Sequence, residues 1–170
     1  MLWQEQETGG RYAVVARTLT FLFRGGDVLL LRVAATSPWA GRLNGIGGHL
    51  EPGEGVLAGA LREVREETGL EPRDLALRGV VHITPPDPAE RGVLLFVFLG
   101  IAPEGATTPS AEGVTAWYPA DALPVTEMVE DVPLLLPRLL AAHERGGIVY
   151  GHYAVGAGGA LRYAFTDAPR

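Results

Sequence analysis

The sequence predicts a mixed α/β (α+β) fold, and three observations support this prediction. Runs rich in β-branched and aromatic residues, which are typical of strands, recur along the chain. Two segments carry helix signals, one before residue 70 and one after residue 130. Stretches rich in glycine and proline separate these segments. The 170 residues fit one domain, spanning 1–170, with a sizeable core.

The first part of the chain is predicted to form a β-hairpin followed by a loop. Residues 11–23 and 28–33 are strongly apolar and rich in Val and Leu, so both indicate strands. The turn signal Arg-Gly-Gly-Asp lies between them, at residues 24–27. Residues 34–48 contain Pro38 and four glycines, which predicts a loop with room for one short strand.

Residues 56–68 are predicted to form the first helix. Apolar side chains recur there at the spacing of one helix face: Leu57, Ala60, Leu61 and Val64. Gly69 follows, where a glycine commonly ends a helix.

Further strands and a second helix are predicted in the C-terminal half. Residues 75–84 and 92–101 indicate strands joined by a proline-rich loop, and residues 114–118 indicate a short strand. The second helix is expected to begin at Asp131, with Pro133 in its first turn and a bend at Pro137.

A glycine-rich hairpin is expected at the C-terminal end of the chain. Its strands lie at residues 148–153 and 160–166, around the glycines of residues 156–159. No helix follows these glycines, so they are interpreted as a turn and not as a phosphate-binding loop.

Composition excludes several classes of protein. The net charge of −6 gives no general attraction to double-stranded nucleic acid or to an anionic membrane surface. The absence of cysteine excludes disulfides and thiolate metal sites. No signal peptide is recognisable, and no apolar stretch reaches the roughly 18 residues of a membrane span, so we expect a soluble cytoplasmic protein.

Three glutamates on the first predicted helix carry the chemistry. Glu63, Glu66 and Glu67 are spaced at i, i+3 and i+4, which places their Cβ atoms roughly 5–6 Å apart on one patch. Carboxylates held so close repel one another, and a hard cation such as Mg²⁺ or Mn²⁺ relieves that repulsion. A helix face that simply faces solvent is the alternative interpretation of the same three residues.

The segment around these glutamates, GHLEPGEGVLAGALREVREETGL, resembles the Nudix box. That pattern has a glycine, five residues, a glutamate, seven residues, Arg-Glu, an aliphatic residue, one residue, Glu-Glu, one residue, glycine and an aliphatic residue. The chain fills all nine specified positions across residues 48–70: Gly48, Glu54, Arg62, Glu63, Val64, Glu66, Glu67, Gly69 and Leu70. The resemblance implies a MutT-like Nudix hydrolase with an α/β/α sandwich and a mixed central sheet.

The resemblance also implies a metal site. In the family, the three helical glutamates bind Mg²⁺ or Mn²⁺, which corresponds to Glu63, Glu66 and Glu67. The carbonyl before the box glycine often joins them, here that of Gly47. A further acidic ligand often comes from a distant loop, and Glu112 is the candidate, although an ordinary exposed loop glutamate is equally compatible with its position.

Two other box residues are implied to support the catalytic loop. The family's box arginine, here Arg62, pairs with the first box glutamate, here Glu54, and holds the loop against the helix. The general base is expected to be Glu66 or Glu63, with Glu112 as a third candidate.

Two stretches resemble the subgroup of 8-oxo-dGTP diphosphatases, which act on oxidised purine nucleoside triphosphates. Residues 42–48, Arg-Leu-Asn-Gly-Ile-Gly-Gly, resemble that subgroup's entry to the box, in which the asparagine contacts the base; this implies substrate contacts by Asn44 and Gly48. Met128 and Asp131 match a second, base-reading run, in which Val129 replaces a stacking tryptophan.

Each of the two base-reading candidates also has a structural interpretation. For Met128, core packing is favoured over base contact, and Asp131 is at least as compatible with capping of the second helix as with base contact. Trp39 or Trp117 is a candidate for the missing stacking residue.

The resemblance implies a small-molecule nucleotide substrate and an enzyme that is a monomer or homodimer. The expected reaction is Mg²⁺-dependent hydrolysis of a purine nucleoside triphosphate to the monophosphate and pyrophosphate. Alternative substrates are nucleotide sugars, dinucleoside polyphosphates and RNA 5′ ends. A nucleotide-sensing Nudix domain without catalysis is the alternative from a different class.

Overall fold

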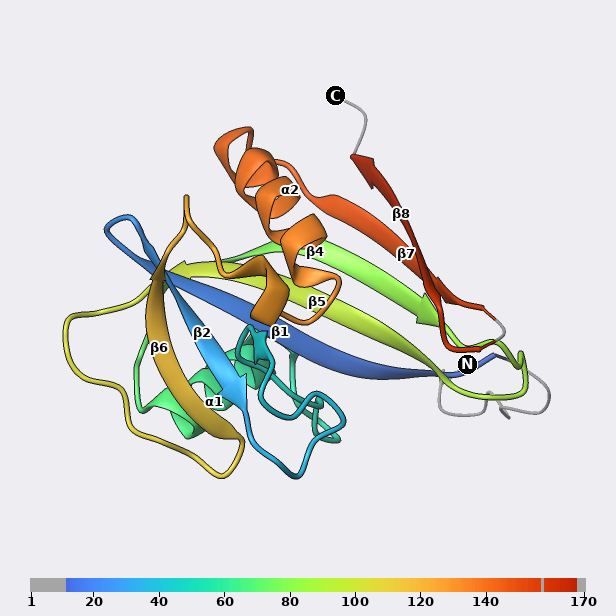
Figure 1. The fold of residues 1–170 in the computed structure, drawn as a ribbon, viewed down its shortest axis with the longest axis horizontal. Coiled ribbons are helices and arrows are strands. Elements are labelled where there is room, and N and C mark those ends of the chain that lie inside the picture. Colours follow the sequence, from blue (N-terminus) through green and yellow to red (C-terminus); the bar gives the residue numbers. More distant parts are fainter. Residues whose placement is uncertain (1–11, 157, 168–170) are drawn as a thin grey trace.

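The computed structural model describes residues 12–156 and 158–167 (Figure 1). Every strand and helix expected from the sequence is present, with shifts of a few residues at the ends. In chain order the elements are β1 (Val14–Arg24), β2 (Asp27–Val33), β3 (Leu43–Asn44), α1 (Val56–Thr68), β4 (Arg73–Thr84), β5 (Gly92–Ile101), β6 (Gly113–Pro119), η2 (Val125–Glu127), α2 (Val132–Glu144), β7 (Val149–Val155) and β8 (Leu161–Asp167).

Within the described residues the strands form one sheet of eight strands. Seven follow the order β3-β2-β1-β5-β4-β7-β8, and β6 pairs with β2 beside this path. β1 and β5 pair in parallel, as do β4 and β7, while the other named pairs are antiparallel. The predicted mixed sheet is therefore confirmed.

The two helices cover opposite faces of the sheet, because successive residues of a strand point to opposite faces (Figure 1). Two hydrophobic clusters form the core: a larger one that contains the buried residues of α2 (the α2 cluster) and a smaller one that contains Val64 of α1 (the α1 cluster). On β1, Phe21 packs in the α2 cluster and its neighbour Leu22 packs in the α1 cluster. Three leucines of α2 are fully buried in the larger cluster: Leu135, Leu136 and Leu139. Val64 is the α1 residue buried in the smaller cluster. This arrangement confirms the predicted α/β/α sandwich.

The ends of the helices follow the residues expected from the sequence. Gly69 ends α1 in the left-handed conformation, with φ 73°. Asp131 immediately precedes α2, and Pro133 lies in its first turn. The Asp131 side chain makes no capping hydrogen bond, however, so the capping interpretation is wrong for its carboxyl group. Neither α1 nor α2 is long and apolar enough to cross a membrane.

The loop that leads into α1 is attached directly to β1. The Thr20 N–H donates to the carbonyl of Ile46, the Thr18 N–H donates to that of Gly48 at 2.9 Å, and the Leu50 N–H donates to that of Ala16 at 3.1 Å. β1 therefore has the loop on one side and parallel β5 on the other. This attachment fixes the loop, β1 and α1 relative to one another.

Candidate active site

The three glutamates of α1 differ sharply in exposure. Glu67 is 2% exposed, the Glu63 side chain is 13% exposed, and the Glu66 side chain is 57% exposed. Glu63 and Glu67 lie against the loop attached to β1, at Gly48 and Gly47 respectively, and Glu67 lies deepest because it sits on the face that packs toward the sheet. The alternative interpretation, a helix face that simply faces solvent, is therefore wrong for Glu63 and Glu67.

Glu67 is a buried carboxyl group with only one partner. Its Oε1 accepts a hydrogen bond from the Gly47 N–H at 3.2 Å, whereas its Oε2 is buried and has no hydrogen-bond partner in the described residues. The pKa of Glu67 is raised to about 8, chiefly by burial and then by the nearby charge of Glu63, while the hydrogen bond from the Gly47 N–H opposes the shift. A cation bound next to this carboxyl group would favour its charged form and would give the unpartnered oxygen a ligand.

Arg62 connects the loop to the glutamate cluster. Its Nε and Nη2 donate to the two carboxylate oxygens of Glu54 at 2.9 and 3.1 Å, and Nη2 also donates to the His49 carbonyl at 3.0 Å. Nη1 donates to both Glu63 and Glu66, at 3.0 Å each. Hydrogen bonding from Arg62 lowers the pKa of Glu54. The structure thus brings Arg62 and Glu54 together in the bracing arrangement that the sequence resemblance implies.

A cavity of about 300 Å³ lies beside this cluster, and Glu112 reaches it from the loop before β6. Its charge is one of the causes that raise the pKa of Glu63 and Glu67, although burial is the largest for both. Gly48 also lines the cavity, and a Cβ there would collide with the Glu63 carboxylate. The tertiary structure therefore gathers Gly48, Glu63, Glu67 and Glu112 around one space.

The donors around this cavity fit a hard divalent cation. Carboxylates of Glu63, Glu67 and Glu112 line it, and the Oε2 atom of Glu67 is buried without a partner in the described residues. Among the described residues, no group of three or more acidic or histidine side chains is already arranged around a single point in a way that could hold a metal ion. Two of the glutamates, Glu63 and Glu66, accept hydrogen bonds from the Arg62 guanidinium.

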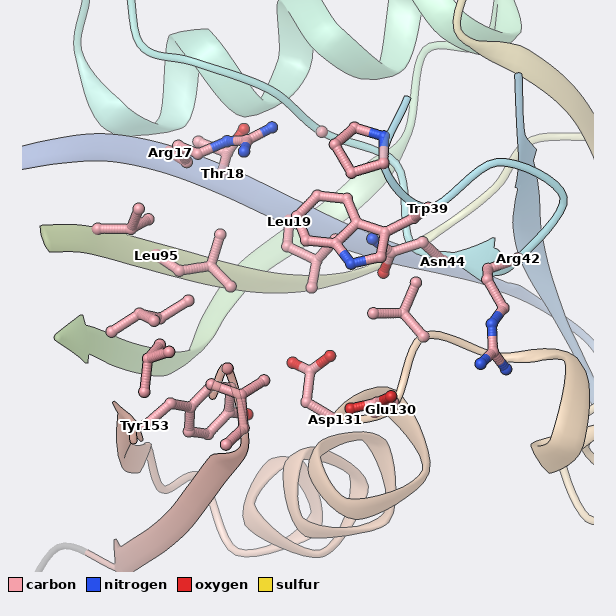
Figure 2. Close-up of a pocket in the computed structure, with 18 of the residues that line it drawn as sticks. Arg17, Thr18, Leu19, Trp39, Arg42, Asn44, Leu95, Glu130, Asp131 and Tyr153 are labelled. Atoms are coloured by element: carbon pink, nitrogen blue, oxygen red, sulfur yellow. The ribbon is translucent and has the colours of Figure 1, made fainter. Parts of the chain in front are cut away.

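A second cavity, of about 600 Å³, lies on the α2 side of the sheet (Figure 2). Much of its wall is apolar and comes from β1, β4, β5, β7 and β8. Asn44 lines it from β3, and Asp131 points into it from the start of α2. Trp39 lines it as well, whereas Trp117 packs against the α1 cluster under the Arg24 guanidinium. Of the two stacking candidates, only Trp39 therefore lies in this cavity.

The polar side chains of Asn44, Asp131 and Tyr153 line the mostly apolar second cavity. The Asn44 Oδ1 accepts a hydrogen bond from the Gly45 N–H at 2.8 Å, which orients the amide. Burial raises the pKa of Asp131. Tyr153, on β7, has a buried hydroxyl group without a hydrogen-bond partner in the described part of the chain, and burial and the Asp131 carboxyl raise its pKa.

Met128 lies outside the cavity lining. It is 1% exposed and packs in the α2 cluster, while the next residue, Val129, lines the cavity. Arg42 fixes this segment, because its Nη1 donates to the carbonyls of Thr126 and Met128 at 3.0 and 3.1 Å. The packing interpretation of Met128 is the one that its position supports.

Sequence reasoning missed two residues of the cavities, Arg17 and Tyr153. Arg17 lines both cavities, and Gly47 is the one other residue that the two linings share. A signal for Arg17 exists in the sequence, because it is a lone charge inside the apolar strand VVARTLTFLF. Tyr153 carries no such signal, because it belongs to an ordinary alternation of buried and exposed residues.

Comparison with known proteins identifies the family. A sequence model of the NUDIX domain matches residues 13–139. The chain therefore belongs to the Nudix family.

Solved structures share the fold. A mutator MutT protein from Bacillus halodurans superposes with a TM-score of 0.70 at 22% identity, over 92% of this chain and 100% of that one. The MutT protein from Methanosarcina mazei Go1 gives 0.63 at 25% identity, over 79% and 98%. The Nudix domain of Shewanella oneidensis NrtR, complexed with ADP ribose, gives 0.64 at 19% identity, over 84% and 94%.

Proposed function

We propose that the protein hydrolyses a purine nucleoside triphosphate, ordinary or oxidised, to the monophosphate and pyrophosphate in a Mg²⁺-dependent reaction. The observation that carries this proposal is the junction of the two cavities at Arg17 and Gly47. One cavity is apolar and large enough for a base and sugar, and the other is lined by carboxylates. A nucleotide with its base in the first would direct its phosphates to the second.

The larger cavity offers complementary groups for a purine edge. The Asn44 amide can donate and accept hydrogen bonds. A buried carboxyl group with a raised pKa, such as Asp131, can accept as a carboxylate and donate when it is protonated. Trp39, which lines the cavity and is 46% exposed, offers an aromatic face for stacking. An oxidised and an ordinary purine differ in donors and acceptors, so these groups would decide between them.

The smaller cavity offers ligands for the cation. Glu63, Glu66 and Glu67 would hold Mg²⁺ or Mn²⁺, with the Gly47 carbonyl and Glu112 as further ligands. When bound, the cation supplies Lewis acidity toward phosphate oxygens and a more acidic water.

The protein's own groups would orient the site and move the proton. Arg62 and Glu54 hold the loop so that the Gly47 N–H fixes Glu67. A carboxylate removes a proton from the attacking water, and Glu63, Glu66 and Glu112 are the candidates because all three lie at or beside the cavity.

A hydrolysis screen with identified products tests the proposal. The panel contains 8-oxo-dGTP, the ordinary nucleoside triphosphates, ADP-ribose, a nucleotide sugar, a dinucleoside polyphosphate and a 5′-triphosphate RNA, each with Mg²⁺ or with EDTA. We expect a purine nucleoside monophosphate and pyrophosphate, formed only with the metal. Cleavage restricted to ADP-ribose, the sugar or the RNA would contradict the proposed substrate, and tight binding without hydrolysis would indicate a sensing domain.

Variants separate the metal site from the base site. Glu67→Gln should reduce turnover by orders of magnitude with little change in fold, whereas the same substitution at Glu104, which is exposed in the loop after β5, should leave turnover unchanged. Asp131→Asn should alter the ratio of activities on 8-oxo-dGTP and dGTP, because an amide replaces a group that can exchange donor and acceptor roles. An unchanged ratio would remove Asp131 from base recognition.

A further inference from the structure

Among the residues that the structure describes, Arg17 is the one basic residue that lines both cavities. Each cavity has a second arginine, but those side chains are already occupied. Arg42 donates to backbone carbonyls of the segment before α2, and Arg62 donates to Glu54, Glu63 and Glu66. The Arg17 side chain makes no hydrogen bond or ion pair within residues 12–156 and 158–167. Its guanidinium is therefore free to bind a ligand.

The backbone around Arg17 is held on both sides. Arg17 pairs with Leu95 of parallel β5 and, by a single antiparallel bridge, with His49 of the loop. The residues on either side, Ala16 and Thr18, hydrogen-bond to Leu50 and Gly48. The side chain therefore projects from a fixed point next to the loop that carries Gly47. Figure 2 shows it beside Thr18, on the side of the cavity away from Asp131.

An unpaired, half-buried cation at this junction needs an anion. Partial burial removes some of its water, and no carboxylate in the described residues has taken the place of that water. The wall on one side is apolar and the other side is lined by carboxylates, so an anionic group alone would be repelled by the second. A ligand with an apolar ring system, followed directly by a phosphate, matches both sides. Guanidinium binds phosphate oxygens with two parallel hydrogen bonds.

We infer that Arg17 binds the phosphate nearest the nucleoside, and that it thereby selects 5′-nucleotides and places the remaining phosphates at the carboxylates. This inference rests on the proposed function, because it assumes that the larger cavity holds the nucleoside. Arg17 is then a substrate-binding residue at the junction, outside the Nudix box, and it offsets the repulsion between the phosphates and the acidic cavity. Its contribution requires neither the metal nor hydrolysis.

Calorimetric binding without metal tests the inference. The probes are deoxyguanosine and its 5′-monophosphate, together with the 8-oxo forms of both, in buffer with EDTA. The measured quantity is the ratio of the two dissociation constants, nucleoside over monophosphate, for the wild type, Arg17→Gln and Arg17→Lys. A charge-assisted contact predicts that Arg17→Gln reduces this ratio by about 10- to 100-fold, and that Arg17→Lys retains part of it.

Three further outcomes keep the inference separate from a structural role. Arg73→Gln removes an equal charge from an exposed position at the start of β4 and should leave the ratio unchanged. An unchanged ratio in Arg17→Gln would overturn the inference while leaving the proposed function intact, provided that the wild type binds and hydrolyses nucleotides. Equal weakening of nucleoside and monophosphate by Arg17→Gln would indicate a packing role and would also overturn it.

Failure of the proposed function has a different signature. In that case the wild type itself would bind neither the nucleoside nor the monophosphate, and it would hydrolyse none of the triphosphates. The inference about Arg17 would then fall with it. Thermal unfolding of each variant, compared with the wild type, excludes loss of the fold as the cause of weaker binding.

Discussion

Replacing Glu67 by glutamine is predicted to stabilise the metal-free protein at alkaline pH. The folded state raises the pKa of this carboxyl group from its ordinary 4.5 to about 8, chiefly by burial and then by the charge of Glu63. Between these two values the folded protein keeps a proton that the unfolded chain has released. Stability due to this group is therefore present below pH 4.5 and is lost as the pH rises toward 8.

The size of this effect follows from the pKa difference. Each pH unit between the two values costs about 1.4 kcal/mol of unfolding free energy, so the loss approaches about 4–5 kcal/mol by pH 8. Glutamine retains an oxygen that can accept the hydrogen bond from the Gly47 N–H, but it carries no charge. We therefore expect Glu67→Gln to remove most of this pH dependence.

The assay is urea unfolding in EDTA at a series of pH values from 5 to 8, for the wild type, Glu67→Gln and Glu104→Gln. The glutamine at the exposed position 104 should leave the pH dependence as it is in the wild type. A bound cation favours the charged form of Glu67, so added Mg²⁺ should stabilise the wild type more at pH 8 than at pH 5 and should stabilise Glu67→Gln less. Equal pH slopes in the wild type and Glu67→Gln would refute the reasoning.

Three other substitutions test the supports of the site and the core. Arg62→Lys cannot reproduce the two parallel hydrogen bonds to Glu54, so chemical unfolding should show a loss of about 1–3 kcal/mol, and a wild-type stability would contradict the bracing role. Gly48→Ala places a methyl group against the Glu63 carboxylate, so titration calorimetry should show weaker Mg²⁺ binding, while unchanged binding would contradict the prediction that position 48 must lack a side chain for the site to form. Leu139→Ala opens a cavity beneath α2, and unfolding should show a loss of about 2–5 kcal/mol; a much smaller loss would mean that the core closes around the vacancy.

Local sequence patterns predicted most of the fold because they report local physics. The apolar spacing in α1 places Val64 toward the sheet, and Gly69 ends the helix with the positive φ that glycine tolerates. The turns around residues 24–27 and 158–159 follow from their glycines. Register and strand order could not be obtained in this way, because pairing between β1 and β5 depends on contacts between residues nearly 80 positions apart.

The positions of Asp131 and Met128 could not be predicted from local sequence patterns. Each had two interpretations, and both were locally reasonable. Asp131 does precede a helix, but its carboxyl group points into the larger cavity and caps nothing. Met128 belongs to a run that resembles a base-reading segment, but its side chain is buried in the core and Val129 lines the cavity instead.

The sequence by itself determined the family, since the spacing of Gly48, Glu54, Arg62 and the three glutamates is a property of one continuous segment. Only the tertiary structure decided the rest of the site. Glu112 lies at the same cavity as Glu63 and Glu67, and Arg17 lines both cavities. Trp39 lines the larger cavity, whereas Trp117 does not. The physical reason is that these contacts join separate strands and loops, and a sheet register that no single segment encodes sets which side chains meet.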